Sequence, residues 1–403
     1  MNYKLQRYIK RHLEPELRHS LQSFPVTALL GPRQCGKSTL ARHVVSEIEN
    51  TTYLDLEKPS DLRKLDDPEF FFHTQQQKLV CIDEIQIGPE LFPIMRVIVD
   101  DDRRPGKFLI LGSASQDLIR NSAETLAGRI HFIELAPFTY NELILDDPRQ
   151  FSDPTLPWTR GGFPDSLLAQ SDTISYQWRE DFIRTFLERD IPQFGFSIPA
   201  VTLRRFWTML AHYHGQTLNA SKLGQSLGVR HPTVKKYLDI MDQTFMVRIL
   251  PPLAVNLKKR LVKTPKIYIR DAGLLHTLLE IENTEGLFGH PNVGVSWEGW
   301  CLEQIVGVMP GWRASFYRTS SGEEIDLILE RGRKRLAFEF KASMSPKVSR
   351  GFIGSLDVLN PDRSFVIAPV PEPYPLKSGA LVTNILGALE ALRATPSVLS
   401  AEV

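Results

Sequence analysis

The sequence predicts an α/β protein in which a parallel sheet with helices on both faces is followed by two smaller regions. Short apolar runs alternate with helical patterns over about the first 145 residues, which is typical of a parallel sheet covered on both sides. Turn-rich segments around residues 146–157 end this part of the chain. A helical pattern over about residues 171–246 and a mixed pattern from about residue 256 predict the two further regions. The apolar runs expected to form strands are 26–30, 52–56, 79–82, 108–111 and 130–133.

Composition and charge exclude several classes of protein. The 403 residues include 48 Lys and Arg against 47 Asp and Glu, so the net charge of +1 excludes a polybasic protein but allows a local basic face. Hydrophobic residues make up 42%, as in globular rather than disordered chains. The three cysteines lie far apart, which excludes a disulfide framework and predicts a reducing compartment. No apolar run approaches the roughly 20 residues that cross a bilayer, so we expect a cytoplasmic protein with no membrane partner.

The first apolar run leads directly into a glycine-rich loop with the pattern GxxxxGKS. The loop stands between a predicted strand and a predicted helix, where backbone N–H groups at a helix N-terminus bind phosphate. The two glycines let the backbone curl around phosphates, Lys37 reaches the β- and γ-phosphates, and Ser38 holds Mg²⁺. The residues expected to bind the nucleotide are Gly31, Pro32, Arg33, Gln34, Cys35, Gly36, Lys37, Ser38 and Thr39.

Polar residues after later strands complete the expected nucleotide site. Asp83 follows an apolar strand and is placed to orient Mg²⁺, while Glu84 is placed to polarise the attacking water. Ser113 follows the next strand and either contacts the γ-phosphate or belongs to an ordinary turn. Arg129 precedes the fifth run and points away from its own nucleotide. It acts either on a neighbouring subunit or as a surface residue paired with an acid.

Together these motifs resemble those of an AAA+ ATPase, and more specifically of a prokaryotic AAA+ group with a fused C-terminal domain. The resemblance covers nearly the whole chain and implies ATP and Mg²⁺ as ligands. It also assigns a sensor role to Ser113 and an arginine-finger role to Arg129. Because an arginine finger acts on a neighbour's nucleotide, we expect a homo-oligomeric ring, with a hexamer favoured. The matching segments are Arg11-His-Leu13, 31–39, 81–86, 112–113, 126–129, 135–142, 161–164, 188–191 and 237–252.

The middle region has the pattern of a winged helix-turn-helix, with two predicted helices over 218–227 and 230–241 and a short strand after them. The start of the second helix carries basic residues suited to phosphates and base edges, and a basic stripe follows between residues 258 and 270. The alternatives are a lid or protein contact for the winged helix, and a solvated surface for the stripe. The residues expected to bind DNA are Arg230, Lys235, Lys236, Lys258, Lys259 and Arg260.

The last region carries acidic residues and a lysine on predicted strands. Period-two alternation places Glu339 and Lys341 on one strand face, and pairing with the preceding strand adds Asp326. Glu298 on an earlier helix is the fourth member, and in this order the residues resemble the PD-(D/E)xK nuclease core. These groups predict a second Mg²⁺ or Mn²⁺ bound by Glu298, Asp326 and Glu339, with Lys341 near the attacking water. The alternatives are a buried salt-bridge network and a metal that only supports folding.

The sequence therefore favours a Mg²⁺-dependent ATPase that binds DNA and remodels it or moves along it. The competing function is an ATP-gated regulatory switch that acts through protein contacts of the winged helix. The expected domains are an ATPase domain over 1–150, a helical linker or lid over 151–200, a winged helix over 201–255 and a restriction-endonuclease-like α/β domain over 256–403.

Overall fold

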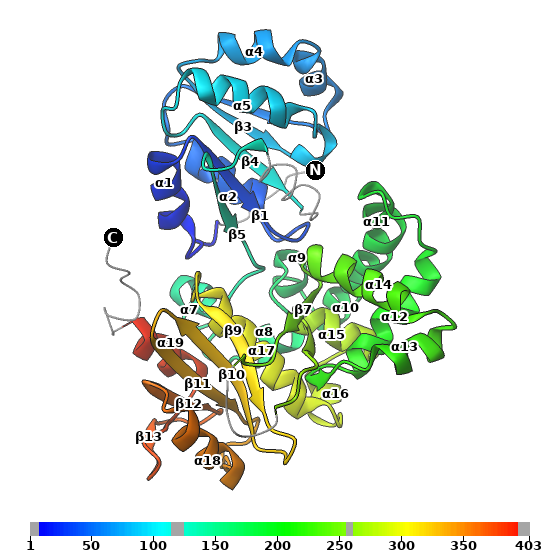
Figure 1. Ribbon diagram of the computed structural model, residues 1–403, viewed down its shortest axis with the longest axis vertical. Helices are drawn as coiled ribbons and strands as arrows, with labels where there is room; N and C mark the ends of the chain where they lie inside the picture. The colour runs from blue at the N-terminus through cyan, green and yellow to red at the C-terminus, as the bar shows by residue number, and fades with distance from the viewer. Residues whose placement is uncertain (1–7, 114–124, 255–260, 394–403) are drawn as a thin grey trace. The chain divides into compact units, whose positions relative to one another are not determined.

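The computed structural model describes residues 8–113, 125–254 and 261–393 (Figure 1). The chain divides into two compact units, one made of residues 1–138 with 243–245 and the other of the remaining residues. Within the described ranges, no helix combines the length and the apolar character needed to cross a membrane.

The first unit contains the predicted parallel sheet. Its five strands follow the order β2-β3-β4-β1-β5, and all neighbouring strands are parallel. The strands are β1 Val26–Leu30, β2 Thr51–Asp55, β3 Leu79–Asp83, β4 Phe108–Gly112 and β5 Ile130–Glu134. The helices are α1 Glu14–Ser23, α2 Lys37–Val45, α3 Pro59–Leu62, α4 Pro68–Thr74 and α5 Leu91–Asp101, with short 3-10 turns at Arg63–Leu65 and Ile85–Ile87.

Helices cover both faces of this sheet, as the continuous apolar runs predicted. Val26 and Ala28 of β1 point to one face, where they share a core with Phe92 and Met95 of α5. Thr27 points to the other face, where its hydroxyl lies 2.7 Å from that of Ser20 in α1. Every residue of β1 is buried, because this strand lies between β4 and β5 and is covered by helices on both faces.

The second unit begins with helices and a small antiparallel sheet. The sheet has the order β6-β8-β7. The helices α13 and α14 form as predicted, because Asn219 caps the start of α13 and Gly228, with φ 69°, ends it. Strand β8 lies beyond residue 255, where the sequence predicted the end of the middle domain. The strands are β6 Gln216–Thr217, β7 Val247–Leu250 and β8 Lys266–Ile269. The helices are α7 Tyr140–Asp146, α8 Thr155–Arg160, α9 Pro164–Leu167, α10 Asp172–Thr185, α11 Ile191–Gln193, α12 Ala200–His212, α13 Ala220–Leu227, α14 His231–Gln243, α15 Ala272–Leu278 and α16 Thr284–Phe288, with a π-helical turn at Phe186–Asp190.

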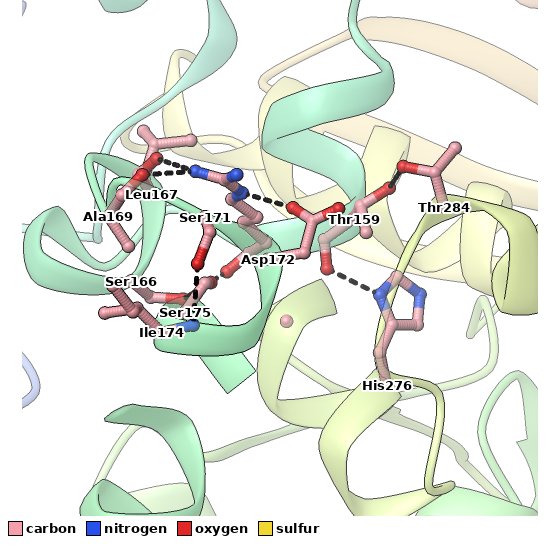
Figure 2. A network of polar contacts seen from close by, with 12 residues as sticks. Thr159, Ser166, Leu167, Ala169, Ser171, Asp172, Ile174, Ser175, His276 and Thr284 are labelled. Carbon is pink, nitrogen blue, oxygen red and sulfur yellow. Dashed lines mark hydrogen bonds and ion pairs between the residues drawn. The ribbon is translucent and has the colours of Figure 1, made fainter. Parts of the chain in front are cut away.

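Polar contacts hold the helices at the start of this unit together (Figure 2). The Arg160 guanidinium at the end of α8 donates to Asp172 of α10 at 2.7 Å. Ser171 caps α10, since its hydroxyl accepts from the backbone N–H of Ile174 at 3.2 Å. Nδ1 of His276 in α15 lies 2.9 Å from the carbonyl oxygen of Thr159, as Figure 2 shows. Burial lowers the pKa of His276 to about 3, so this ring is neutral and belongs to the packed interior.

The second unit ends in a six-stranded mixed sheet with the order β13-β14-β12-β11-β10-β9. The strands β9 to β11 form an antiparallel meander, and α18 then crosses over so that β12 lies parallel to β11. Helix α18 packs on the face that carries Ile325, Ala337 and Val366. The elements are α17 Val293–Gly307, β9 Arg313–Arg318, β10 Glu324–Arg331, β11 Lys334–Phe340, α18 Arg350–Leu359, β12 Arg363–Ile367, β13 Tyr374–Pro375, β14 Leu381–Thr383 and α19 Ile385–Arg393.

Candidate functional site

The glycine-rich loop between β1 and α2 depends on both of its glycines. At Gly31 the backbone passes so close to the Leu135 carbonyl oxygen that a Cβ atom would collide with it. Gly36 has φ 100°, a conformation that residues with a side chain rarely adopt. Helix α2 begins at the next residue, so its first N–H groups, which have no partner within the helix, lie at the loop. This conformation leaves backbone N–H donors that would face a phosphate in the loop.

Lys37 lies over this loop. Its side chain is buried, and Nζ donates to the carbonyl oxygens of Gly31 at 2.9 Å and Pro32 at 2.8 Å. The ammonium is therefore held by the same backbone segment that the glycines shape. Lys37 is thus already beside the loop, where its positive charge could bind a phosphate oxygen.

Arg11 supports the loop from the N-terminal segment. Its buried guanidinium donates to the carbonyl oxygen of Cys35 at 3.0 Å and to that of Ala136 at 2.6 Å. The loop is thereby joined to the segment that follows β5. The sequence placed Arg11 in a matching motif but assigned it no role.

The acid pair lies at the end of β3. Asp83 is buried, and its Oδ2 accepts a hydrogen bond from the Tyr53 hydroxyl at 2.5 Å. Burial, reinforced by Asp83, raises the pKa of Tyr53, so this hydroxyl keeps its proton and orients the carboxylate. A fixed carboxylate at the carboxyl end of a strand, together with Ser38 in the first turn of α2, fits a magnesium ion bound with the nucleotide.

Glu84, Gln86 and Ser113 form one connected group. The Gln86 amide donates to the Glu84 carboxylate and, at 3.1 Å, to Oγ of Ser113. Arg33 of the glycine-rich loop lies 4.0 Å from the same carboxylate. Burial raises the pKa of Glu84, while the nearby Lys37 and Arg33 oppose the rise. The structure thus brings together residues from the loop, β3 and β4, and Gln86 is the member to which the sequence assigned no role.

Arg129 lies apart from this group. It immediately precedes β5, and because the strands are parallel, it lies at the edge of the sheet opposite to the glycine-rich loop. Its Nε donates to Asp100 at 2.6 Å, and this hydrogen bond lowers the pKa of the aspartate. Within one subunit, the structure therefore shows the surface ion pair that the sequence left as an alternative.

The start of α14 exposes the predicted basic residues. Arg230, Lys235 and Lys236 are exposed, while Val234 and Leu238 are buried in the core of the helical region. Lys258, Lys259 and Arg260 lie outside the described residues.

The prediction of an exposed basic stripe between residues 258 and 270 is wrong for Lys266 and Arg270. Lys266 is only 2% exposed, and Arg270 forms an ion pair with Glu303 of α17 at 3.1 Å. Both side chains point inward because β8 pairs with β6 and β7 and lies against α17.

The predicted C-terminal group does assemble, but around a lysine. Asp326 and Glu339 lie on the adjacent strands β10 and β11, whose register pairs Leu327 with Phe338. Nζ of Lys266 lies 3.0 Å from Glu298 and 3.7 Å from Asp326. Among the residues that the structure describes, no group of three or more His, Cys, Asp or Glu residues is arranged to hold a metal ion. The second metal site expected from the sequence is therefore not supported, because an ammonium group lies among its ligands.

Comparisons with known proteins divide the chain into three matched segments. The family described as AAA domain matches residues 23–144. Two families described as domains of unknown function, DUF8612 and DUF4143, match residues 156–285 and 293–386.

Two curated relatives match most of the chain. The uncharacterized protein Rv2008c of Mycobacterium tuberculosis is 41% identical over 367 residues, which cover 91% of this chain and 81% of that protein. The uncharacterized protein Mb2031c of Mycobacterium bovis matches to the same extent, at 41% identity over 91% of this chain and 81% of its own length. Among solved structures, the Walker-type ATPase PABY2304 of Pyrococcus abyssi is 16% identical, with a TM-score of 0.48 and coverage of 68% of this chain and 96% of that one.

Proposed function

This chain belongs to the family of the two mycobacterial proteins and contains an AAA-type P-loop ATPase domain; from that premise we propose a Mg²⁺-dependent ATPase that binds DNA and remodels it or moves along it. The observation that carries ATP hydrolysis is the connected group of Glu84, Gln86 and Ser113 beside the loop that holds Lys37. DNA as the partner is supported by the exposed basic start of α14.

The residues of the nucleotide site have separate roles in ATP hydrolysis. Lys37 and the backbone N–H groups of the loop bind the phosphates, while Mg²⁺ held by Ser38 and Asp83 would neutralise phosphate charge. Glu84 accepts the proton of the attacking water once its carboxylate leaves Gln86. Ser113 shares the Gln86 amide, so it is placed to couple the position of Glu84 to an occupied nucleotide site.

The middle region supports a winged helix-turn-helix. Helices α12, α13 and α14 with the sheet β6-β8-β7 have the chain order of that fold, and β7 and β8 form its hairpin. We propose an ATPase domain over 1–150, a helical linker or lid over 151–200, a winged helix over 201–255 and an α/β domain over 256–403. Strand β8 is then added to the winged helix, because it pairs with β6 and β7. The chain order α17, β9, β10, β11, α18, β12 likewise supports a PD-(D/E)xK-like fold for the last part.

DNA binding through α14 is tested with Lys235→Ala/Lys236→Ala. We expect weaker DNA binding and less DNA stimulation of the ATPase, because two exposed charges that neutralise phosphates are lost. The slope of log affinity against log salt concentration should fall by about one per lost contact. Binding titrations over duplex, fork, junction and single-stranded DNA at two salt concentrations measure this slope. Lys377→Ala, which removes an exposed lysine after the β13 strand, is the control.

A negative result has a defined meaning. An ATPase rate that no DNA stimulates, together with an unchanged salt slope in the double variant, would contradict DNA binding through α14. That outcome would favour the ATP-gated switch, in which the same helix contacts a protein.

We further propose a homo-oligomeric ring in which Arg129 exchanges Asp100 for the neighbour's nucleotide. Arg129→Ala should then lower the ATPase rate about 1,000-fold or more, as expected for an arginine finger. Mixing Arg129→Ala with Lys37→Ala subunits should restore part of the rate, because each variant supplies what the other lacks. Sedimentation with an ATP analogue measures the assembly. Full activity of isolated Arg129→Ala monomers would contradict the proposal.

A further inference from the structure

Three carboxylates of the second unit converge on one buried ammonium group. Nζ of Lys266 in β8 lies 2.7 Å from Glu324, 3.0 Å from Glu298 and 3.7 Å from Asp326. The acids come from α17 and β10, and the lysine comes from a different sheet. Acidic oxygens from separate elements that converge on one cation are the usual surroundings of a divalent metal ion. Here the cation is part of the chain.

Most of the remaining polar atoms of this cluster are also engaged, and within the described residues Oε2 of Glu339 is buried without a hydrogen-bond partner. The Tyr268 hydroxyl donates to Glu298 at 2.5 Å, and the backbone N–H of Phe340 donates to Asp326 at 3.0 Å. Lys341 donates to Glu339 at 2.6 Å rather than standing free beside a water molecule. The residues of the nuclease-like pattern are thus held by other groups of the chain, and Lys266 takes the position between Glu298 and Asp326 that a catalytic metal ion would need.

The chain supplies the cations of this cluster itself. Lys266, Lys341 and Arg318, whose Nε lies 3.6 Å from Glu324, are positively charged. Lys266 contacts Glu298, Glu324 and Asp326, and Lys341 contacts Glu339. A divalent ion between Glu298 and Asp326 would meet the ammonium group of Lys266 at close range, and like charges repel.

The same strands make a second ionic contact with α17. Arg248 of β7 and Arg270 after β8 both bind Glu303, whose side chain is 12% exposed. Burial opposes the charged form of this glutamate, but the two arginines lower its pKa overall. The small sheet is therefore tied to α17 at Glu298 and again at Glu303, through three basic side chains.

We propose that the ammonium group of Lys266 takes the place of a metal ion in the C-terminal domain. The domain then binds the sheet β6-β8-β7 through these ion pairs and does not cleave DNA. Lys266 neutralises the acids that a nuclease would use for its metal. The arginine pair at Glu303 completes the attachment. This attachment joins the sheet β6-β8-β7 to the C-terminal domain and does not depend on ATP hydrolysis.

The test is Mn²⁺ binding by the full chain without nucleotide, measured by calorimetry and by the shift in melting temperature. Wild-type protein should gain no Mn²⁺ site at this cluster. Lys266→Ala removes the ammonium and leaves three facing carboxylates, so it should bind Mn²⁺ at least tenfold more tightly and be stabilised by it. Adding Asp326→Asn to Lys266→Ala should remove the new site. Lys263→Ala, which removes an exposed lysine three residues earlier, should behave as wild type.

Two results would overturn the proposal. One is Mn²⁺ binding or Mn²⁺-dependent DNA nicking by wild-type protein that Asp326→Asn abolishes. The other is a folded Lys266→Ala protein that binds Mn²⁺ no better than wild type. If Lys266→Ala does not fold, the comparison of wild type with Asp326→Asn still decides between a metal site and an internal ammonium.

Discussion

Replacing Glu84 with glutamine is expected to preserve ATP binding and to slow turnover by about 100-fold or more, the usual contribution of a general base. Glutamine has nearly the same shape but cannot accept the proton of the attacking water. Among the residues of the phosphate-binding loop, Arg33 lies 4.0 Å from Glu84, and glutamine preserves the shape of this side chain, so nucleotide affinity should change little. Steady-state turnover and the affinity for a fluorescent ATP analogue measure the two effects separately.

A matched control for this variant is Glu57→Gln. Glu57 also pairs with Arg33, at 2.9 Å, but its side chain is 45% exposed and lies outside the group formed by Glu84, Gln86 and Ser113. It should hydrolyse ATP at nearly the wild-type rate. Glu84→Gln turnover equal to wild type would remove Glu84 from the catalytic role.

Replacing Lys37 with alanine is expected to weaken ATP binding by about 100-fold or more, which corresponds to roughly 3 kcal/mol. The ammonium is buried over the loop, where a charge-assisted hydrogen bond to phosphate is stronger than one in water. The substitution also leaves the carbonyl oxygens of Gly31 and Pro32 without their donor, so some loss of stability should accompany it.

Thermal melting without nucleotide separates the two effects of Lys37→Ala. A folded variant should show no increase in melting temperature with ATP and Mg²⁺, whereas wild type should be stabilised by mass action. Lys58→Ala, which removes a lysine paired with Asp55 and 56% exposed, is the control and should respond as wild type. Equal ATP affinity in Lys37→Ala and wild type would contradict the assignment of the loop.

Local chemistry made much of the first unit predictable. The loop requires a glycine at residue 36 for its positive φ and at residue 31 for close packing, and both needs appear directly in the sequence. The apolar strands were predicted because a sheet buried on both faces needs continuous apolar runs. Helices α13 and α14 were predicted for the same kind of reason, since their apolar spacing and the glycine between them are local signals.

The order of the strands was decided only by the tertiary structure. Strand β4 lies between β1 and β3, and this position brings Ser113 to Gln86 and Glu84. An apolar run predicts that a strand is buried, but it does not predict which strand lies beside it. The order of the strands depends on how the helices pack on the two faces of the sheet. The role of Gln86 therefore had no signal in the sequence beyond its place in a motif.

The direction of the basic side chains in β8 was also decided by tertiary packing. A run of Lys and Arg residues without acids between positions 258 and 270 predicts a solvated face or a phosphate-binding stripe. The acids that bind Lys266 and Arg270 lie more than 25 residues further along the chain, in α17 and β10. By itself, the sequence determined the phosphate-binding loop, because its conformation depends on adjacent residues. Only the fold determined whether a lysine meets DNA or a buried carboxylate, because that depends on which strands pair.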